Sequence, residues 1–80
     1  MAEFNLKIRS FRQIQALVKL AAEQPFDIMV GNEWQQINGK DLMGMCSLDY
    51  DRPVKVSVRC EESVYEAFRQ QAEQLVQDNL

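Results

Sequence analysis

The chain contains no histidine, and only two cysteines, two prolines and three glycines among its 80 residues. The absence of histidine removes the commonest general base, the commonest metal ligand and the commonest phosphoryl carrier. Two cysteines that form no CxxC pair predict neither a disulfide framework nor a zinc site. Free thiols are typical of a reducing compartment, so we expect a cytoplasmic protein without a metal or other cofactor.

Excess positive charge and long apolar runs are also lacking. Nine basic and twelve acidic residues give a net charge of −3, whereas direct nucleic-acid binding favours basic surfaces that displace counterions. No apolar run is long enough to span a membrane, and the first residues do not resemble a secretory signal. We therefore expect neither nucleic acid nor membrane as a partner. The length predicts one small domain, residues 1–80, with little room for an elaborate active-site cavity.

The apolar residues follow strand and helix periods in turn. Alternation predicts strands over residues 4–8, 26–30, 33–37 and 54–60, and helical spacing predicts helices over residues 10–24, 41–48 and 61–77. Three helices of this size are too few to cover both faces of a sheet. The sequence thus predicts an α+β open-faced β-sandwich of order β-α-β-β-α-β-α. Its four-stranded, mostly antiparallel sheet should carry the three helices on one face and be wet on the other.

The start of the first helix is one place where chemistry could occur. Ser10 and Gln13 have the spacing of a capping box, which predicts Ser10 as the N-cap. Arg12 lies in the first turn, and a helix N-terminus with an arginine nearby favours anion binding. Ser10 has no neighbour in sequence that would activate it as a nucleophile. A capping serine and a solvated arginine are therefore the simpler interpretation, and we predict no catalysis here.

Asp41 stands where the short second helix is predicted to begin. Its carboxylate is expected to accept hydrogen bonds from the N–H groups of Met43 and Gly44, and the helix dipole would favour its charge. A capping role alone would account for an aspartate at this position.

The short helix should present two different faces. Met45 and Leu48 are three residues apart and are predicted to face the sheet. Leu42, Met43 and Cys46 would then form an exposed cluster, and such clusters often mark contact surfaces to which methionine adapts well. The alternative is that Met43 is half-buried packing and Leu42 is incidentally exposed.

The last helix is predicted to begin near Glu61, with Ser63 and Glu66 as a second capping box. Either of the acids at 61 and 62 would cap it equally well. Its apolar stripe is expected to pack on the sheet and consists of Val64, Phe68, Ala72 and Leu75.

The segment KDLMGMCSL, residues 40–48, resembles the second-helix motif of the HPr family, the histidine-containing phosphocarriers of the sugar phosphotransferase system. In that motif a lysine and a regulatory serine precede an apolar residue and then Met-Gly-x-x-Ser-Leu. The match is specific at Met43, Gly44, Ser47 and Leu48. The resemblance extends over essentially the whole chain and implies the HPr fold.

The chain departs from this family at the residues that carry phosphate. Ser10 occupies the position of the phosphorylated histidine, Arg12 that of the family's arginine, and Gln13 that of the following proline. Asp41 stands in place of the regulatory serine and would fix a negative charge there. The resemblance therefore implies that the phosphohistidine relay is lost. A related paralogue without the histidine serves in catabolite repression by docking on a transcriptional repressor of the LacI type.

These observations predict a regulatory protein-binding module that is not an enzyme. Its partner would be a transcriptional regulator or a component of the phosphotransferase system. The predicted binding residues lie on the first two helices and are Ser10, Arg12, Asp41, Leu42, Met43 and Cys46. Two alternatives stay open: a phosphocarrier that uses Ser10 as its phosphoryl acceptor, and an unrelated α+β interaction domain whose motif match is accidental.

Overall fold

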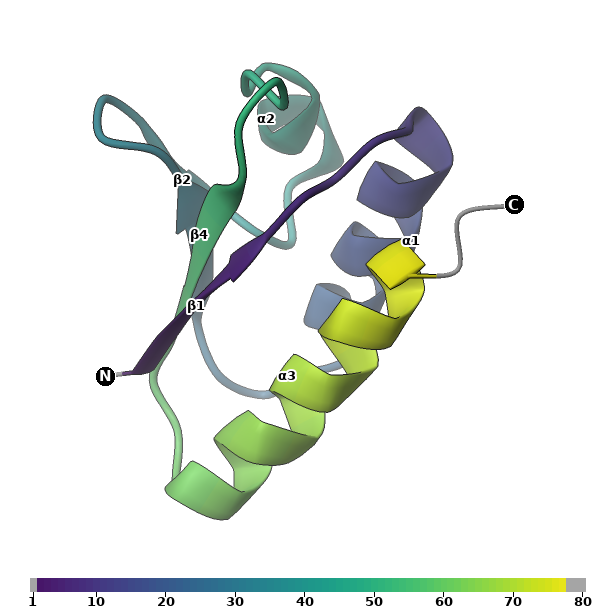
Figure 1. Ribbon diagram of the computed structural model, residues 1–80. Coiled ribbons are helices and arrows are strands. Elements are labelled where there is room, and N and C mark those ends of the chain that lie inside the picture. The colour runs from purple at the N-terminus through teal and green to yellow at the C-terminus, as the bar shows by residue number, and fades with distance from the viewer. Residues whose placement is uncertain (1, 78–80) are drawn as a thin grey trace.

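The computed structural model describes residues 2 to 77 (Figure 1). The elements are β1 (Ala2–Leu6), α1 (Phe11–Ala22), β2 (Ile28–Gly31), β3 (Gln36–Asn38), α2 (Leu42–Cys46), β4 (Val54–Val58) and α3 (Glu62–Gln77). This order and the α+β class confirm the prediction. No helix in the described part of the chain is both long and apolar enough to cross a membrane.

The sheet has the order β1-β4-β2-β3, and every neighbouring pair of strands is antiparallel. The central strand β4 places Val56 opposite Phe4 of β1 and Val30 of β2. One position earlier, Lys55 lies opposite Gly31 on the other face of the sheet. Because side chains alternate along a strand, the valines of β4 point to one layer and its polar residues to the other. The predicted apolar and wet faces are both present.

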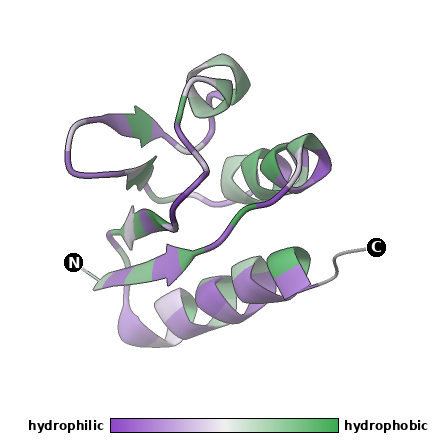
Figure 2. Cartoon of the chain, turned by 45° about the horizontal axis from the view of Figure 1, so that its top comes forward, coloured by the Kyte–Doolittle hydropathy of each residue, from purple (hydrophilic) through white to green (hydrophobic). Residues whose placement is uncertain are grey.

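The three helices cover the apolar face of the sheet (Figure 1). Helix α1 contacts both α2 and α3, while α2 also contacts β3 and α3 contacts β1. Hydrophobic and hydrophilic residues alternate along the strand at the N-terminal end (Figure 2), as expected for a sheet with one buried face. The core between the layers consists of Leu6, Ile8, Ile14, Leu17, Ala21, Ile28, Val30, Met45, Leu48, Val54, Val56, Val58, Phe68 and Ala72.

The connection between β2 and β3 is longer than predicted. Strand β3 begins at Gln36 instead of residue 33. The Oδ1 atom of Asn32 accepts hydrogen bonds from the N–H groups of Trp34 (2.8 Å) and Gln35 (2.9 Å). This side chain folds the segment into a turn, because asparagine bonds readily to the backbone two residues on.

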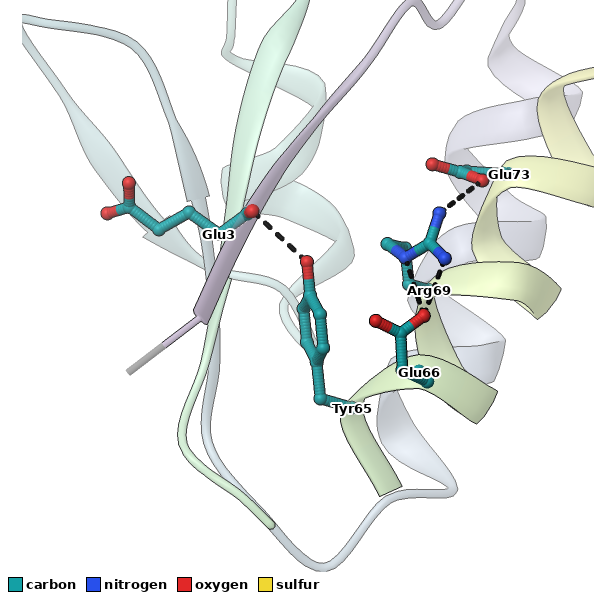
Figure 3. Close-up of polar contacts among 5 residues, drawn as sticks. All are labelled: Glu3, Tyr65, Glu66, Arg69 and Glu73. Carbon is teal, nitrogen blue, oxygen red and sulfur yellow. Dashed lines mark hydrogen bonds and ion pairs between the residues drawn. The ribbon is translucent and has the colours of Figure 1, made fainter. Parts of the chain in front are cut away.

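Helix α3 is tied to the edge strand β1 near its start (Figure 3). The hydroxyl of Tyr65 donates to the carbonyl oxygen of Glu3 at 3.1 Å. The predicted stripe is buried at Phe68 and Ala72, but Val64 is exposed. The first turn of α3 extends past the end of the sheet (Figure 1). Ser63 lies inside this helix, which starts at Glu62, so Ser63 is not its N-cap. Glu61, one of the two acids that the sequence offered as an alternative, precedes the helix.

The solvent side of α3 carries an ion-pair network centred on Arg69 (Figure 3). Its guanidinium contacts Glu66 at 2.5 Å and Glu73 at 2.9 Å, at i−3 and i+4 spacing. Hydrogen bonds to these two carboxylates raise the pKa of Arg69. Pairs at this spacing favour the helical conformation, and because they are exposed to solvent their contribution to stability is small.

Candidate functional site

The start of α1 is fixed by side chains close to it in sequence. Ser10 has an extended backbone, and its Oγ accepts a hydrogen bond from the N–H group of Gln13 at 3.1 Å. The Gln13 Oε1 atom accepts from the N–H group of Arg9 at 2.7 Å, one residue earlier than a capping box requires. Gln13 also donates from Nε2 to the carbonyl of Val76 on α3 at 3.3 Å. Ser10 is therefore the N-cap as predicted, and the buried Gln13 ties the start of α1 to the end of α3.

The hydroxyl of Ser10 borders a hollow of 430 Å³ between the start of α1 and the loop after α2. Lys7 and Asp51 are among the lining residues. The Nζ atom of Lys7 donates to the carbonyls of Tyr50 (2.6 Å) and Asp51 (2.7 Å), so this cation ties the strand-to-helix connection to the loop. The Ser10 hydroxyl acts as an acceptor in the cap, which is a structural role and not that of an activated nucleophile.

Arg12 lines a different surface from Ser10. It borders the groove between α1 and α3, together with Lys19 and Gln71. Between Ser10 and Arg12, the side chain of Phe11 is 55% exposed. Sequence reasoning missed Phe11 as a surface residue, because its three-residue spacing from Ile14 resembles the buried stripe. As the first residue of α1 it lies at the very start of that stripe, where its ring remains largely exposed.

Helix α2 has the two faces that its sequence predicted. Met45 and Leu48 are buried in the core, whereas Met43 is 85% exposed and Leu42 is 37% exposed. Cys46 is exposed on the last turn and is a free thiol. The apolar residues of this segment are therefore divided between the core and the exposed surface. The alternative of a half-buried Met43 is wrong.

Gly44 allows α2 to lie directly on β3. A Cβ atom at this position would lie 2.7 Å from the Cγ2 atom of Ile37 and 2.9 Å from the Oδ2 atom of Asp41. Both distances are shorter than real Cβ contacts, so any larger residue would push the helix away from the sheet or displace the carboxylate. The glycine of the Met-Gly pair is thus explained by close packing.

Asp41 occupies the N-cap position of α2, but the predicted side-chain cap is wrong. Its backbone is extended, and its carbonyl accepts from the N–H group of Met45 at 2.9 Å, yet its carboxylate makes no capping hydrogen bond. The carboxylate lies beside Gly44, in the space that a side chain would take there. The charge of Asp41 is consequently exposed to solvent and is not engaged with the first turn of the helix.

The end of α2 is held by Tyr50, which sequence reasoning did not single out. Its hydroxyl donates to the carbonyl oxygen of Met45. Partial burial and, to a smaller extent, the nearby charge of Cys46 raise the pKa of Tyr50 to about 12. The carbonyl of Tyr50 accepts from Lys7, as described above. This one residue therefore connects α2 to the segment that leads into α1. Its only sequence signal is that it is the sole aromatic residue of the loop at residues 49–53.

The cysteines offer no assembled redox or metal centre. Burial and, to a smaller extent, the charge of Glu61 raise the pKa of the Cys60 thiol, and this lowers its reactivity. Cys60 packs against the core. No group of three or more cysteine, aspartate or glutamate side chains in residues 2–77 is arranged to hold a metal ion.

Comparisons with known proteins place these helices in a family context. The family model described as "PTS HPr component phosphorylation site" matches residues 10–78. Among solved structures, HPr-C-His from Thermoanaerobacter tengcongensis is similar at 22% identity and a TM-score of 0.76, with 100% of both chains covered. The phosphocarrier protein HPr from Bacillus anthracis is similar at 15% identity and a TM-score of 0.72, covering 94% of this chain and 95% of that one.

A third similar structure is that of the catabolite repression protein Crh from Bacillus subtilis, described as a domain-swapped, intertwined dimer. It is 20% identical with a TM-score of 0.66, and the alignment covers 100% of this chain and 93% of that chain. At these identities the structural likeness establishes the fold. A search of curated protein sequences found no match.

Proposed function

The chain belongs to the HPr family, the phosphocarriers of the sugar phosphotransferase system, and we propose on that premise that it is a regulatory, noncatalytic member that binds a protein partner. The observation that carries the proposal is the exposure of Met43, 85%, on the family's second helix in a chain without a histidine. The partner is a transcriptional regulator or a component of the phosphotransferase system. Residues 1–80 act as one HPr-like domain, which binds this partner in the cytoplasm.

The proposed binding surface is built on the α2 residues Leu42, Met43 and Cys46 with Asp41, and it extends onto α1 through Ser10 and Arg12, which border two different hollows there. We call these six residues the α1–α2 face. Complete burial of a methionine side chain contributes about 1.5–3 kcal/mol, so capture of Met43 by a partner is a substantial driving force. Helices α1 and α2 contact each other, which gives the apolar cluster a rigid support. Phe11, also exposed between Ser10 and Arg12, extends the apolar area of the same region.

Asp41 supplies a fixed negative charge at the position of the family's regulatory serine. The absence of a capping bond from its carboxylate favours this role, because the charge is available to a partner and is not satisfied within α2. A charged group that pairs with a partner's cation contributes to orientation and to the rate of association. Replacing Asp41→Asn keeps the size of the side chain and removes the charge. We expect weaker partner binding from this variant, and unchanged affinity would restrict Asp41 to a local structural role.

The decisive experiment for the proposed function is affinity capture from the native host with matched variants. Met43→Asp introduces a charge at the centre of the α1–α2 face, whereas Val64→Asp introduces the same charge at an exposed apolar position on α3. We expect the wild-type protein and Val64→Asp to retain the same partner and Met43→Asp to lose it. Equal capture by all three proteins would place binding elsewhere.

The phosphocarrier alternative needs its own test, because the family's carriers receive phosphate from phosphoenolpyruvate. Incubating the protein with labelled phosphoenolpyruvate and the general phosphotransferase enzyme, beside an active HPr as a positive control, should leave this chain unlabelled. Label that is transferred to the wild-type chain and lost in Ser10→Ala would establish a serine carrier and contradict a purely regulatory role.

A further inference from the structure

A second hollow lies on the face of the sheet that carries no helix. It has a volume of 720 Å³ and extends from the strands to the β2–β3 turn and the loop before β4. Gly31 forms part of its lining, with Gln36 and Lys55 as cross-strand neighbours on either side. Gly31 is itself buried, and the space beside its Cα is taken by the backbone carbonyl of Gln35, so the side chains of its neighbours form the exposed lining. This hollow is separate from the α1–α2 face, which lies on the helix-covered side.

One wall of the hollow is the indole of Trp34, which is 89% exposed. The bonds from Asn32 Oδ1 to the N–H groups of Trp34 and Gln35, together with the bond from Asn32 N–H to the Gln35 carbonyl at 2.9 Å, fix the turn that carries it. A ring of this size contributes little to the fold when it is so exposed. Aromatic side chains displayed at rigid turns are effective contact platforms, because little conformational entropy is lost on binding.

The charges around the hollow nearly cancel. Three acids, Glu3, Glu33 and Asp49, lie with two cations, Arg52 and Lys55, and the Nζ atom of Lys55 is 3.7 Å from a carboxylate oxygen of Glu3. An anionic ligand such as a phosphate or a nucleic acid finds no cationic excess here. A cationic ligand finds only one net negative charge. The surface therefore favours a neutral ligand.

The remaining lining groups are rich in both donors and acceptors. The amides of Asn5 and Gln36 each carry one acceptor and two donor hydrogens, the amide of Asn32 adds its two donor hydrogens, and the carboxylates and cations add further partners. A neutral ligand that uses such a lining must offer many hydroxyl groups and an apolar face for the indole. A pyranose ring has this combination, because its axial C–H groups form an apolar face and its hydroxyls lie around the rim.

We infer that the open face of the sheet is a binding site for a neutral oligosaccharide, with Trp34 as the stacking platform and Asn5, Gln36 and the Glu3–Lys55 pair as hydroxyl partners. The lining residues extend from β1 to the β2–β3 turn, so the hollow can hold more than one sugar ring. This site acts independently of the partner-binding proposal, because it uses none of the residues of the α1–α2 face.

The test uses the fact that Trp34 is the only tryptophan of the chain. Its fluorescence is recorded while maltohexaose, cellohexaose or N-acetylchitohexaose is added, and the amide resonances of β1 and β4 are followed by NMR. We expect a saturable change with at least one of the three sugars. In Trp34→Ala, the NMR titration should show binding weakened by about tenfold, since loss of an aromatic contact has an effect of that order.

Matched variants separate this site from general effects. Val64→Ala removes an exposed apolar side chain on α3, outside both proposed surfaces, and should bind the sugar as the wild-type protein does. The circular dichroism of Trp34→Ala should match that of the wild type, because the ring is outside the core. No saturable change with any of the three sugars, or equal binding by Trp34→Ala, would overturn the inference. A fluorescence change on concentrating the protein alone would overturn it as well, in favour of a second copy as the occupant.

Discussion

Helix α1 is capped at its start by the side chain of Ser10, whereas α2 has no side-chain cap and is held by packing on β3 and by a tyrosine beyond its end. Ser10 caps α1 through Gln13, three residues later. Asp41 occupies the corresponding position of α2 without making such a bond. Instead, α2 depends on the contact of Gly44 with Ile37 of β3 and on the hydrogen bond from Tyr50 to its last turn.

The difference shows how a short helix can be firmly positioned while its exposed side chains stay accessible to solvent. A five-residue helix has little intrinsic stability, so its position is fixed from outside by packing. The side chains on its solvent side are not needed for packing, so Met43 and Asp41 can contact a partner there. The start of α1, by contrast, uses its Ser10 hydroxyl and the Gln13 side chain for its own cap and for contact with α3.

The largest expected effect separates the two faces of α2. Met45→Ala removes a fully buried side chain and should lower the free energy of unfolding by about 2–5 kcal/mol, through lost transfer energy and a cavity. Met43→Ala, two residues earlier, should change it by less than about 0.5 kcal/mol. Urea denaturation followed by circular dichroism measures both values. Similar losses for the two variants would mean that Met43 also packs in the core.

The next effect tests whether α2 is fixed by its approach to β3. Gly44→Ala would bring a Cβ atom into Ile37 and the Asp41 carboxylate and should destabilise the fold by about 1–3 kcal/mol, the usual cost of overpacking. On an isolated helix the same change would be stabilising, because alanine favours helix formation more than glycine does. A more stable Gly44→Ala protein would therefore contradict the packing account.

A smaller effect compares the two N-caps directly. Ser10→Ala removes an observed side-chain cap and should cost about 0.5–2 kcal/mol. Asp41→Ala removes a carboxylate without a capping bond, and the expected loss is below about 0.5 kcal/mol. Thermal and urea unfolding of the two variants beside the wild type provide the measurement. Equal losses would show that the two helix starts are capped alike.

The smallest effect concerns Tyr50 and depends on pH. Tyr50→Phe deletes the bond to the Met45 carbonyl and should cost about 0.5–1.5 kcal/mol near neutral pH. The pKa of Tyr50 is about 12 in the folded protein, compared with an ordinary value of 10.0. The folded state therefore keeps a proton that the unfolded state releases, so this contribution is complete below pH 10 and is lost as the pH rises towards 12.

Consequently, the stability of the wild type should fall more steeply above pH 10 than that of Tyr50→Phe. Urea midpoints measured at several alkaline pH values provide the comparison. Parallel curves for the two proteins would show that the hydroxyl of Tyr50 titrates in the same way in both states, and that it does not hold the end of α2.

The sequence was sufficient where the structure depends on local patterns. The alternating valines of residues 54–58 and the Ser10 cap are encoded within a few residues, and both are present in the fold. The KDLMGMCSL motif led to the HPr family, which the family match supports. It also predicted which of Met43 and Met45 would be buried, because helical spacing separates their side chains.

The predictions failed where the placement of a single side chain decides. The Asp41 carboxylate was expected in front of the helix, but its position beside Gly44 depends on how closely α2 approaches β3. The late start of β3 follows from the hydrogen bonds of one asparagine, Asn32. The role of Tyr50 depends on its hydrogen bond to the end of α2, and no periodicity or spacing in the sequence indicates that bond.

The most direct test of the regulatory proposal is an NMR map of the captured partner on the isotope-labelled protein. The account predicts that adding the partner broadens or shifts the amide signals of residues 10–12 and 41–46, while those of the β2–β3 turn and of the first turn of α3 stay unchanged. Signals that respond only on α3 or on the open face of the sheet would contradict it, because the chain would then bind its partner away from the α1–α2 face.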